Sequence, residues 1–249
     1  MTLVQALAVA AAGLIAGASN SIAGGGSLIT FPTLVALGVP PLAANVTNTL
    51  GLIPGAVGGA VAYAGHLEGQ RARVVRLLVP TLLGAVAGTA LLLTTPEDTF
   101  EVLVPPLVAG ACLLLLFQKR LSQALPHAGD EHSASLYVGV AFCGAYAAYF
   151  GSAVSILLLA VLVLFVPDDI QRLNGVKLVL AGCANLLAAI VYVFLAPIVW
   201  SFAAVLLVSS LIGGRIGGHL AQRVPGDALR IGIGCAGLAV SIVLAVRFY

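Results

Sequence analysis

The stretch Ser19-Asn20-Ser21-Ile22-Ala23-Gly24-Gly25-Gly26-Ser27-Leu28-Ile29-Thr30-Phe31-Pro32 decides the fold, because it interrupts a long apolar run. Apolar, helix-like sequence flanks it from Leu3 to Ala18 and from Leu28 to Leu37. Each glycine disfavours helix by about 1 kcal/mol relative to alanine, so we predict a turn here. Such a turn leaves backbone N–H groups without partners at membrane depth, which is tolerated only where it lines a cavity or is covered by protein.

Composition places the whole chain in a membrane. Of 249 residues, 61% are hydrophobic and only 8% are charged, whereas soluble domains carry about 25% charged residues. The apolar runs are continuous rather than alternating, which argues against a β-barrel. The net charge of +2 gives no reason to expect nucleic acid as a partner. We therefore expect an all-α polytopic protein in the lipid bilayer of a cell membrane, the inner membrane in bacteria or archaea.

Eight apolar segments are expected, of which the first and the fifth are overlong and broken. They are Leu3–Leu37, Leu42–Ala64, Val74–Leu93, Val102–Phe117, Ala134–Phe165, Leu173–Phe194, Pro197–Leu220 and Ala228–Phe248. No basic residue precedes the first segment, so we interpret it as a membrane segment rather than a signal peptide. As one helix it would span about 52 Å, against roughly 30 Å for the hydrocarbon core. Each broken segment is therefore expected to enter and leave on the same side.

The pattern of segments occurs twice. Residues 1–120 form a first repeat, 121–133 a polar connecting loop and 134–249 a second repeat. Gly17 to Pro40 lines up with Gly144 to Pro167 at constant spacing. The connection after the second segment is basic, whereas its counterpart after the sixth is uncharged. The connection after the third segment is acidic, whereas its counterpart after the seventh is basic. Basic loops tend to be cytoplasmic, so equivalent loops face opposite sides and both termini are extracytoplasmic.

These features predict two inverted-topology repeats. Each repeat opens with a glycine-broken re-entrant helix pair and continues with three transmembrane helices. Transporters built in this way place the substrate where the halves meet, near the midplane of the membrane.

The first break has the features of an anion site. A helix that begins near Ser27 directs unpaired N–H groups and a positive dipole end toward the turn. The glycines let a ligand approach the backbone, and the neighbouring side chains add hydrogen-bond donors. The candidate ligands are Asn20, Ser21, Gly24, Gly25, Gly26 and Ser27. The alternative is a packing turn in which glycines let helices touch.

Polar residues elsewhere provide further candidates. They are Tyr149, Gly151 and Ser152 in the second break, and Asn45, Thr47, Asn48, Asn174 and Lys177 at the openings of the segments that follow the breaks. The group around Asn45 either completes a ligand shell or caps a helix. Lys177 leads into an apolar run, so its ammonium either pairs with a bound anion or snorkels to the interface.

Several chemistries have no candidate residues in the sequence. No carboxylate lies at the centre of an apolar segment, so a proton-linked transporter would need a protonated substrate or a histidine, His66 or His219. No metal-ligand cluster and no ATP-binding glycine loop occurs, so we expect no metal and no cofactor. An intramembrane hydrolase built on Ser152 and His219 is disfavoured because no Gly-x-Ser-x-Gly elbow is present.

Four strings resemble the sulfite exporter TauE/SafE family of membrane permeases. They are Asn20–Pro32, Ala44–Asn48, Tyr149–Gly151 and Asn174–Lys177, the last followed by Asn185. The resemblance covers essentially the whole chain, and it places Asn20, the glycine turn, Asn45, Asn48, Asn174 and Lys177 on characteristic positions of the family. In the second turn, Ser152, Val154 and Ser155 stand where the family has small residues or glycine.

The resemblance implies transport of sulfite, a sulfonate or a related organosulfur anion. Together with the pattern of segments, it favours a secondary transporter of a small oxyanion that works by alternating access between the two broken helices. An anion channel that uses the same donors is the alternative. The oligomeric state stays open, a homo-oligomer included.

Overall fold

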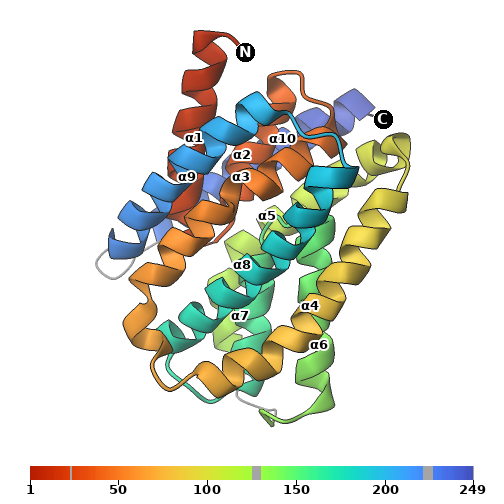
Figure 1. Cartoon of the computed structure of the whole chain (residues 1–249). Helices are drawn as coiled ribbons and strands as arrows, with labels where there is room; N and C mark the ends of the chain where they lie inside the picture. The colour runs from red at the N-terminus through yellow and green to blue at the C-terminus, as the bar shows by residue number, and fades with distance from the viewer. Residues whose placement is uncertain (23, 125–129, 221–226, 249) are drawn as a thin grey trace.

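The computed structural model describes residues 1–22, 24–124, 130–220 and 227–248, and these residues are almost entirely helical. A short 3-10 helix, η1, joins the third and fourth α-helices (Figure 1). The elements in chain order are α1 (Leu3–Ile22), α2 (Ser27–Ala36), α3 (Pro41–Ala62), η1 (Ala64–Leu67), α4 (Arg71–Thr94), α5 (Glu97–Ala124), α6 (Ala134–Tyr149), α7 (Val154–Phe165), α8 (Ile170–Leu195), α9 (Trp200–Leu220) and α10 (Asp227–Phe248).

Both predicted helix breaks are confirmed. The first separates α1 from α2, and the second separates α6 from α7. Gly24 and Gly25 have φ angles of 82° and 80°, and Gly151 has 70°, a left-handed conformation that glycine adopts without a steric penalty. Ala153 also lies there, at 62°, which is uncommon for a residue with a Cβ atom. The chain therefore reverses sharply at both places.

Helix lengths agree with a polytopic membrane protein. Among the described residues, α1, α4, α5, α8 and α9 are long and apolar enough to cross a bilayer. In contrast, α2 has 10 residues and α7 has 12, so they extend only about 15 and 18 Å. Neither can cross a hydrocarbon core of roughly 30 Å alone. Helix α3, with 22 residues, is long enough to cross the core, but its Asn, Thr and Gly residues make it less apolar than the five helices named above.

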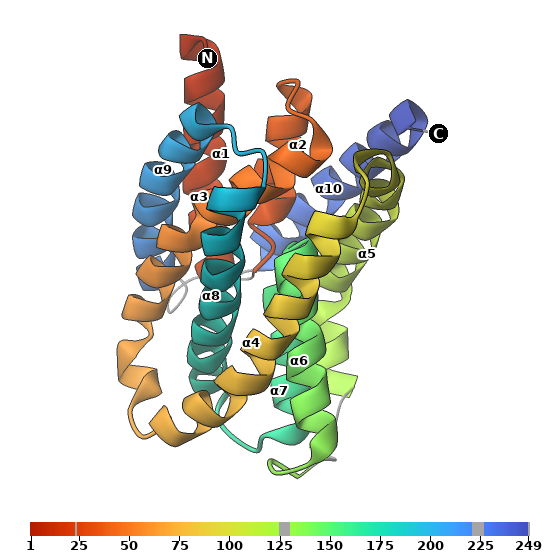
Figure 2. The ribbon, with the colours of Figure 1, turned by 45° about the vertical axis from the view of Figure 1, so that its right-hand side comes forward.

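The helices form two packed groups around α8. On one side α9 packs against α1 and α3, and on the other α4 packs against α6 and α8. Figures 1 and 2 show that both chain termini lie at the same end of the molecule, toward which α2 also extends. The α6–α7 pair extends to the opposite end, where α4 begins. The two broken pairs thus reach into the protein from different ends.

Several helices are longer than the apolar segments predict. The predicted segment Val102–Phe117 is the centre of α5, which begins at Glu97 and runs into the expected connecting loop. Acidic residues in a first turn are favoured by the helix dipole, so α5 begins before its apolar part. Similarly, α8 begins at Ile170, where Asp169 caps it by accepting a hydrogen bond from the Gln171 N–H. His127 of the expected loop lies outside the described residues.

An ion-pair network ties the two halves together at the end opposite the termini. Arg73 of α4 contacts Glu131 at 2.9 Å and Asp168 at 2.5 Å. Arg76 reaches the same Glu131 carboxylate at 2.5 Å, and Arg172 of α8 contacts Asp168 at 2.9 Å. Residues from α4, from the connection before α6 and from the connection before α8 therefore share one set of charges.

Candidate functional site

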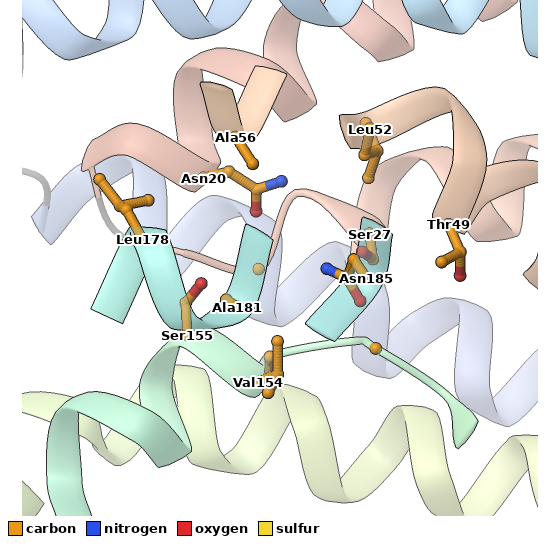
Figure 3. Close-up of a pocket in the computed structure, with 13 residues that line it drawn as sticks. Asn20, Ser27, Thr49, Leu52, Ala56, Val154, Ser155, Leu178, Ala181 and Asn185 are labelled. Atoms are coloured by element: carbon orange, nitrogen blue, oxygen red, sulfur yellow. The ribbon is translucent and has the colours of Figure 1, made fainter. Parts of the chain in front are cut away.

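A small cavity lies between the two helix breaks (Figure 3). Its volume is about 40 Å³, and since about 10–15 Å³ holds one water molecule, it has room for one small polyatomic ion. Its walls come from both breaks and from α3 and α8. The lining residues are Asn20, Gly25, Ser27, Thr49, Leu52, Ala56, Gly151, Ala153, Val154, Ser155, Leu178, Ala181 and Asn185.

The two breaks are in direct contact at this cavity. A Cβ atom built on Gly24 would lie 3.1 Å from the Cβ of Ser155. In the view of Figure 3, Asn20 reaches the cavity from above and Val154 and Ser155 from below, with α8 residues between them. Segments that are more than 120 positions apart in the chain thus form one site.

Asn20 holds the first turn in shape. Its side-chain Oδ1 accepts a hydrogen bond from the Gly26 N–H at 2.7 Å, which leaves the two amide N–H groups of the side chain for the cavity. A methyl group on Gly26 would lie 2.3 Å from the Ala16 carbonyl oxygen, so only glycine fits there. Ser19 and Gly24 close the turn with two mutual hydrogen bonds of 2.8 and 2.9 Å.

Two helix N-termini point unpaired N–H groups at the cavity. Within the described residues, the backbone N–H groups of Ser27, Val154 and Ser155 have no hydrogen-bond partner, and neither helix has a side-chain cap. Ser27 begins α2 and Val154 begins α7. Each N-terminus carries about half a positive charge. Two such ends at one small cavity make it favourable for an anion.

Hydrogen bonds neutralise the opposing carbonyl groups at the end of α6. The Tyr192 hydroxyl donates to the Ala148 carbonyl oxygen, and the Asn45 side-chain amide donates to the Tyr149 carbonyl oxygen at 2.9 Å. The negative end of the α6 dipole is therefore covered, while the N–H groups of α7 stay open. The second break therefore presents free hydrogen-bond donors to the cavity, while the carbonyl acceptors beside them are already bonded.

Two further polar groups at the second break have no partner. The Oγ of Ser152 and the Oδ1 of Asn185 are buried without a hydrogen bond in the described part of the chain. Buried polar atoms are nearly always paired in folded proteins. The oxygen and nitrogen of an Asn amide are assigned from their surroundings, so Asn185 can offer either one to a ligand. A bound ion that accepts from both side chains would satisfy them.

The structure brings four of the predicted ligands to the cavity wall: Asn20, Gly25, Ser27 and Gly151. Gly24 and Gly26 belong to the same turn, and Ser152 lies beside Gly151. Three predicted side chains instead bond within the protein. Ser21 donates to Gly17 and Gly214 carbonyl oxygens, Thr47 accepts from the Val199 N–H, and Asn48 accepts from the Thr30 hydroxyl. For these three residues, as for Asn45 and Tyr149, a role as a ligand stays a prediction.

Lys177 is buried close to the cavity without lining it. Its side chain is only 1% exposed, so the ammonium does not snorkel to the interface. The Nζ donates to the Asn174 Oδ1 at 2.8 Å. Ala181, one helical turn further along α8, does line the cavity. Lys177 therefore places a positive charge near the site, and direct contact between Lys177 or Asn174 and a ligand stays a prediction.

Sequence reasoning missed the helix faces that complete the cavity. Thr49, Leu52 and Ala56 line it from α3, and Leu178, Ala181 and Asn185 line it from α8. Both sets have the three- and four-residue spacing of one helix face, which is a detectable signal once the breaks are identified. Of the pair considered for a hydrolase, Ser152 is buried and His219 is exposed.

Comparisons with known proteins agree with this architecture. The family model described as "Sulfite exporter TauE/SafE" matches residues 9–244. A probable membrane transporter protein of Haemophilus influenzae is 27% identical over 84% of this chain and 82% of its own length. The probable membrane transporter protein YfcA of Escherichia coli is 26% identical over 83% and 77%. The probable membrane transporter protein ORF9 of a Sinorhizobium species is 24% identical over 95% and 89%.

Proposed function

The chain belongs to the sulfite exporter TauE/SafE family of membrane transporters, and from this premise we propose that it is a secondary transporter of sulfite, a sulfonate or a related small oxyanion. The observation that carries the proposal is the set of N–H groups around one cavity, those of Ser27, Val154 and Ser155, that have no partner among the described residues. Sulfite and sulfonate oxygens are acceptors that such groups bind well. An uncharged, donor-rich wall favours an anion over a cation.

The spacing of the helices supports an inverted repeat. The starting residues of α2 and α7, α3 and α8, α4 and α9, and α5 and α10 lie 127 to 130 positions apart. The packing has the same correspondence, because α1 packs on α9 and its counterpart α6 packs on α4. The two broken pairs approach from opposite ends of the molecule (Figure 2). Each of these relations is expected when two halves are related by a twofold axis in the membrane plane.

The cavity is compatible with such an axis. Thr49, Leu52 and Ala56 on α3 line it at the same spacing as Leu178, Ala181 and Asn185 on α8. Every member of the second set lies 129 positions after its counterpart. Equivalent positions of the two halves thus meet around one space, which is where an alternating-access transporter holds its substrate.

The ion-paired end of the protein is proposed to be cytoplasmic and closed. It carries Arg71, Arg73, Arg76 and Arg172, whereas the α4–α5 junction at the other end carries Glu97, Asp98 and Glu101. The end with more arginine and lysine residues is expected to be cytoplasmic, whatever its carboxylates. Because Arg73 links Glu131 and Asp168, opening that side requires these ion pairs to separate.

Ligand binding and counterflow test this function. Purified protein is screened by thermal shift against sulfite, sulfate, thiosulfate, methanesulfonate and small carboxylates. A true ligand at 100 times its Kd stabilises the fold by about 2.7 kcal/mol. The stabilising anion should then show saturable uptake and counterflow exchange in proteoliposomes. Flux without saturation or exchange would support the channel alternative, and the absence of stabilisation by every sulfur oxyanion would refute the assignment.

A further inference from the structure

Three buried side-chain oxygen atoms around the second helix break have no hydrogen-bond partner among the described residues. They are the Asn45 Oδ1 of α3, the Ser152 Oγ of the break itself and the Asn185 Oδ1 of α8. Asn45 is 0% exposed and Ser152 is 1% exposed. Because buried polar atoms are nearly always paired in folded proteins, three such oxygens at one break together indicate a binding site.

The three oxygens belong to residues that surround one short stretch of chain. The Asn45 amide nitrogen donates to the Tyr149 carbonyl oxygen at 2.9 Å. The Asn185 Oδ1 lies 3.9 Å from a Cβ atom built on Gly151, and Ser152 is the next residue along the chain. Thr49, one turn along α3 from Asn45, lines the anion cavity. The oxygens around this stretch therefore lie beside the anion cavity.

The orientation of these groups favours a cation at the oxygens. A carbonyl oxygen can only accept a hydrogen bond, so the Asn45 amide must turn its nitrogen to Tyr149, and its Oδ1 is the unpaired atom. In Figure 3 the side-chain nitrogen of Asn185 points toward the cavity and its oxygen toward the second break. A serine hydroxyl can donate its proton to an anion and still offer lone pairs to a cation. One set of side chains can therefore serve two neighbouring ions of opposite charge.

Neutral oxygen ligands select the kind of cation. Divalent calcium and magnesium are held by carboxylates, and the described residues contain no cluster of acidic, histidine or cysteine side chains that could hold a metal ion. Transporters with broken helices bind sodium through uncharged oxygens beside the substrate. Uncharged ligands do not neutralise the sodium ion, so an anion in the adjoining cavity would be its counter-ion.

We propose that a sodium ion binds at the second break through the oxygens of Asn45, Ser152 and Asn185, and that it is transported together with the anion. This inference rests on the proposed function, because the anion supplies the compensating charge. Each ion should strengthen the binding of the other by the same factor, about 5- to 150-fold for typical coupled sites. A water molecule is the competing occupant of the oxygens, and it predicts no effect of sodium.

The experiment measures anion affinity by calorimetry in three salts. Sulfite and methanesulfonate, supplied as N-methylglucamine salts, are titrated into the purified protein in sodium, potassium or N-methylglucamine chloride. Equal ionic strength keeps general screening the same in all three. The Kd of the anion should be lower in sodium than in the other two salts by about fivefold or more. Reciprocally, sodium should raise the thermal stability more when methanesulfonate is present.

Three variants locate the sodium ion. Ser152→Ala removes one proposed ligand, and since its Oγ has no partner among the described residues, the fold should not be weakened. The ratio of the anion Kd without sodium to that with sodium should fall toward one. Ser241→Ala is the matched control, because it removes a buried hydroxyl that donates to the Pro105 carbonyl oxygen between α10 and α5, and it should keep the wild-type ratio. Asn45→Asp supplies a negative charge itself, so sodium should stabilise this variant without any anion.

Two results would overturn the inference and leave the proposed function intact. One is an anion affinity in the wild type that is the same in all three salts, which would mean that the buried oxygens hold water only. The other is a sodium effect that is unchanged in Ser152→Ala, which would place the sodium ion elsewhere. If neither anion binds to the wild type in any of the salts, the proposed function fails and the inference fails with it.

Discussion

The substitution Asn20→Asp separates the structural role of this residue from its proposed role in anion binding. The Asn20 Oδ1 accepts the Gly26 N–H at 2.7 Å, and a carboxylate oxygen can accept the same bond. The new charge also lies near the N-terminus of α2, where negative charge is favourable. We therefore expect the unfolding free energy to stay within about 1 kcal/mol of the wild-type value, in line with the usual size of dipole effects.

Anion binding should respond very differently. The cavity has a volume of only about 40 Å³, so a bound anion lies about 4 Å from a carboxylate at position 20. At an effective dielectric constant of about 20, the repulsion between two unit charges at that distance is about 4 kcal/mol. Affinity should fall about a thousandfold, because every 1.4 kcal/mol is a factor of ten.

Asn20→Ala is the matched control for this substitution. It removes the hydrogen bond to Gly26 without adding charge, so stability should fall by about 1 kcal/mol, the typical net contribution of one hydrogen bond. Its anion affinity should fall far less than that of Asn20→Asp. Denaturant unfolding and calorimetric titration of both variants give the two quantities. If Asn20→Asp binds the anion as tightly as the wild type, the anion does not sit between the breaks.

Three other perturbations test neighbouring parts of the reasoning. Lys177→Met should weaken anion binding at least severalfold, because the buried ammonium lies on α8 next to the lining residue Leu178 and attracts a bound anion; unchanged affinity in calorimetry would remove the lysine from the electrostatics of the site. The hydrogen bond from Arg73 holds the pKa of Glu131 below its ordinary value, so this pair stabilises the fold above the unfolded carboxyl pKa of about 4.3 and loses its contribution as pH falls through the lower folded value. Arg73→Gln should therefore cost about 2 kcal/mol at neutral pH and flatten the acid side of the stability profile; an equal loss at pH 3 and pH 7 would contradict the assigned ion pair. The orientation can be tested with single cysteines in place of the exposed residues Glu68 and Thr2. An impermeant maleimide should label the cysteine at position 68 only in inverted membrane vesicles and the cysteine at position 2 only in right-side-out vesicles; the reverse pattern would invert the proposed topology.

Much of the architecture follows from a few sequence features. Glycine triplets disfavour helix at any position, so the break at Gly24–Gly26 could be placed within a few residues. The length of the apolar segments then required a reversal, because a single helix would be far longer than the bilayer is thick. The ends of helices were harder to predict from the sequence, since α5 extends beyond its apolar part through a first turn that begins at Glu97.

The site itself was only partly predictable, because a polar residue near a break has several uses. Asn20, Ser27 and Gly151 reach the cavity as expected. In contrast, Asn45 donates to the Tyr149 carbonyl oxygen and Thr47 accepts from the Val199 N–H. Sequence alone does not distinguish a side chain that binds a ligand from one that satisfies the backbone beside it, since both chemistries require the same donors and acceptors.

The side chains that bond to backbone groups beside the breaks are essential to the chemistry of the cavity. A helix break exposes carbonyl groups of the preceding helix as well as N–H groups of the following one, so a bare break would attract neither sign of charge strongly. Asn45 and Tyr192 bind the carbonyl oxygens of Tyr149 and Ala148, while the N–H groups of Val154 and Ser155 have no partner in the described chain. The donors that remain come from two half-length helices, one in each half of the protein. In the proposed transporter, an anion held in this way would lose part of its binding energy whenever the halves separate, and the described residues that line the cavity include no charged side chain to retain it. In the proposed mechanism, release on either side of the membrane would follow from the relative motion of the two breaks.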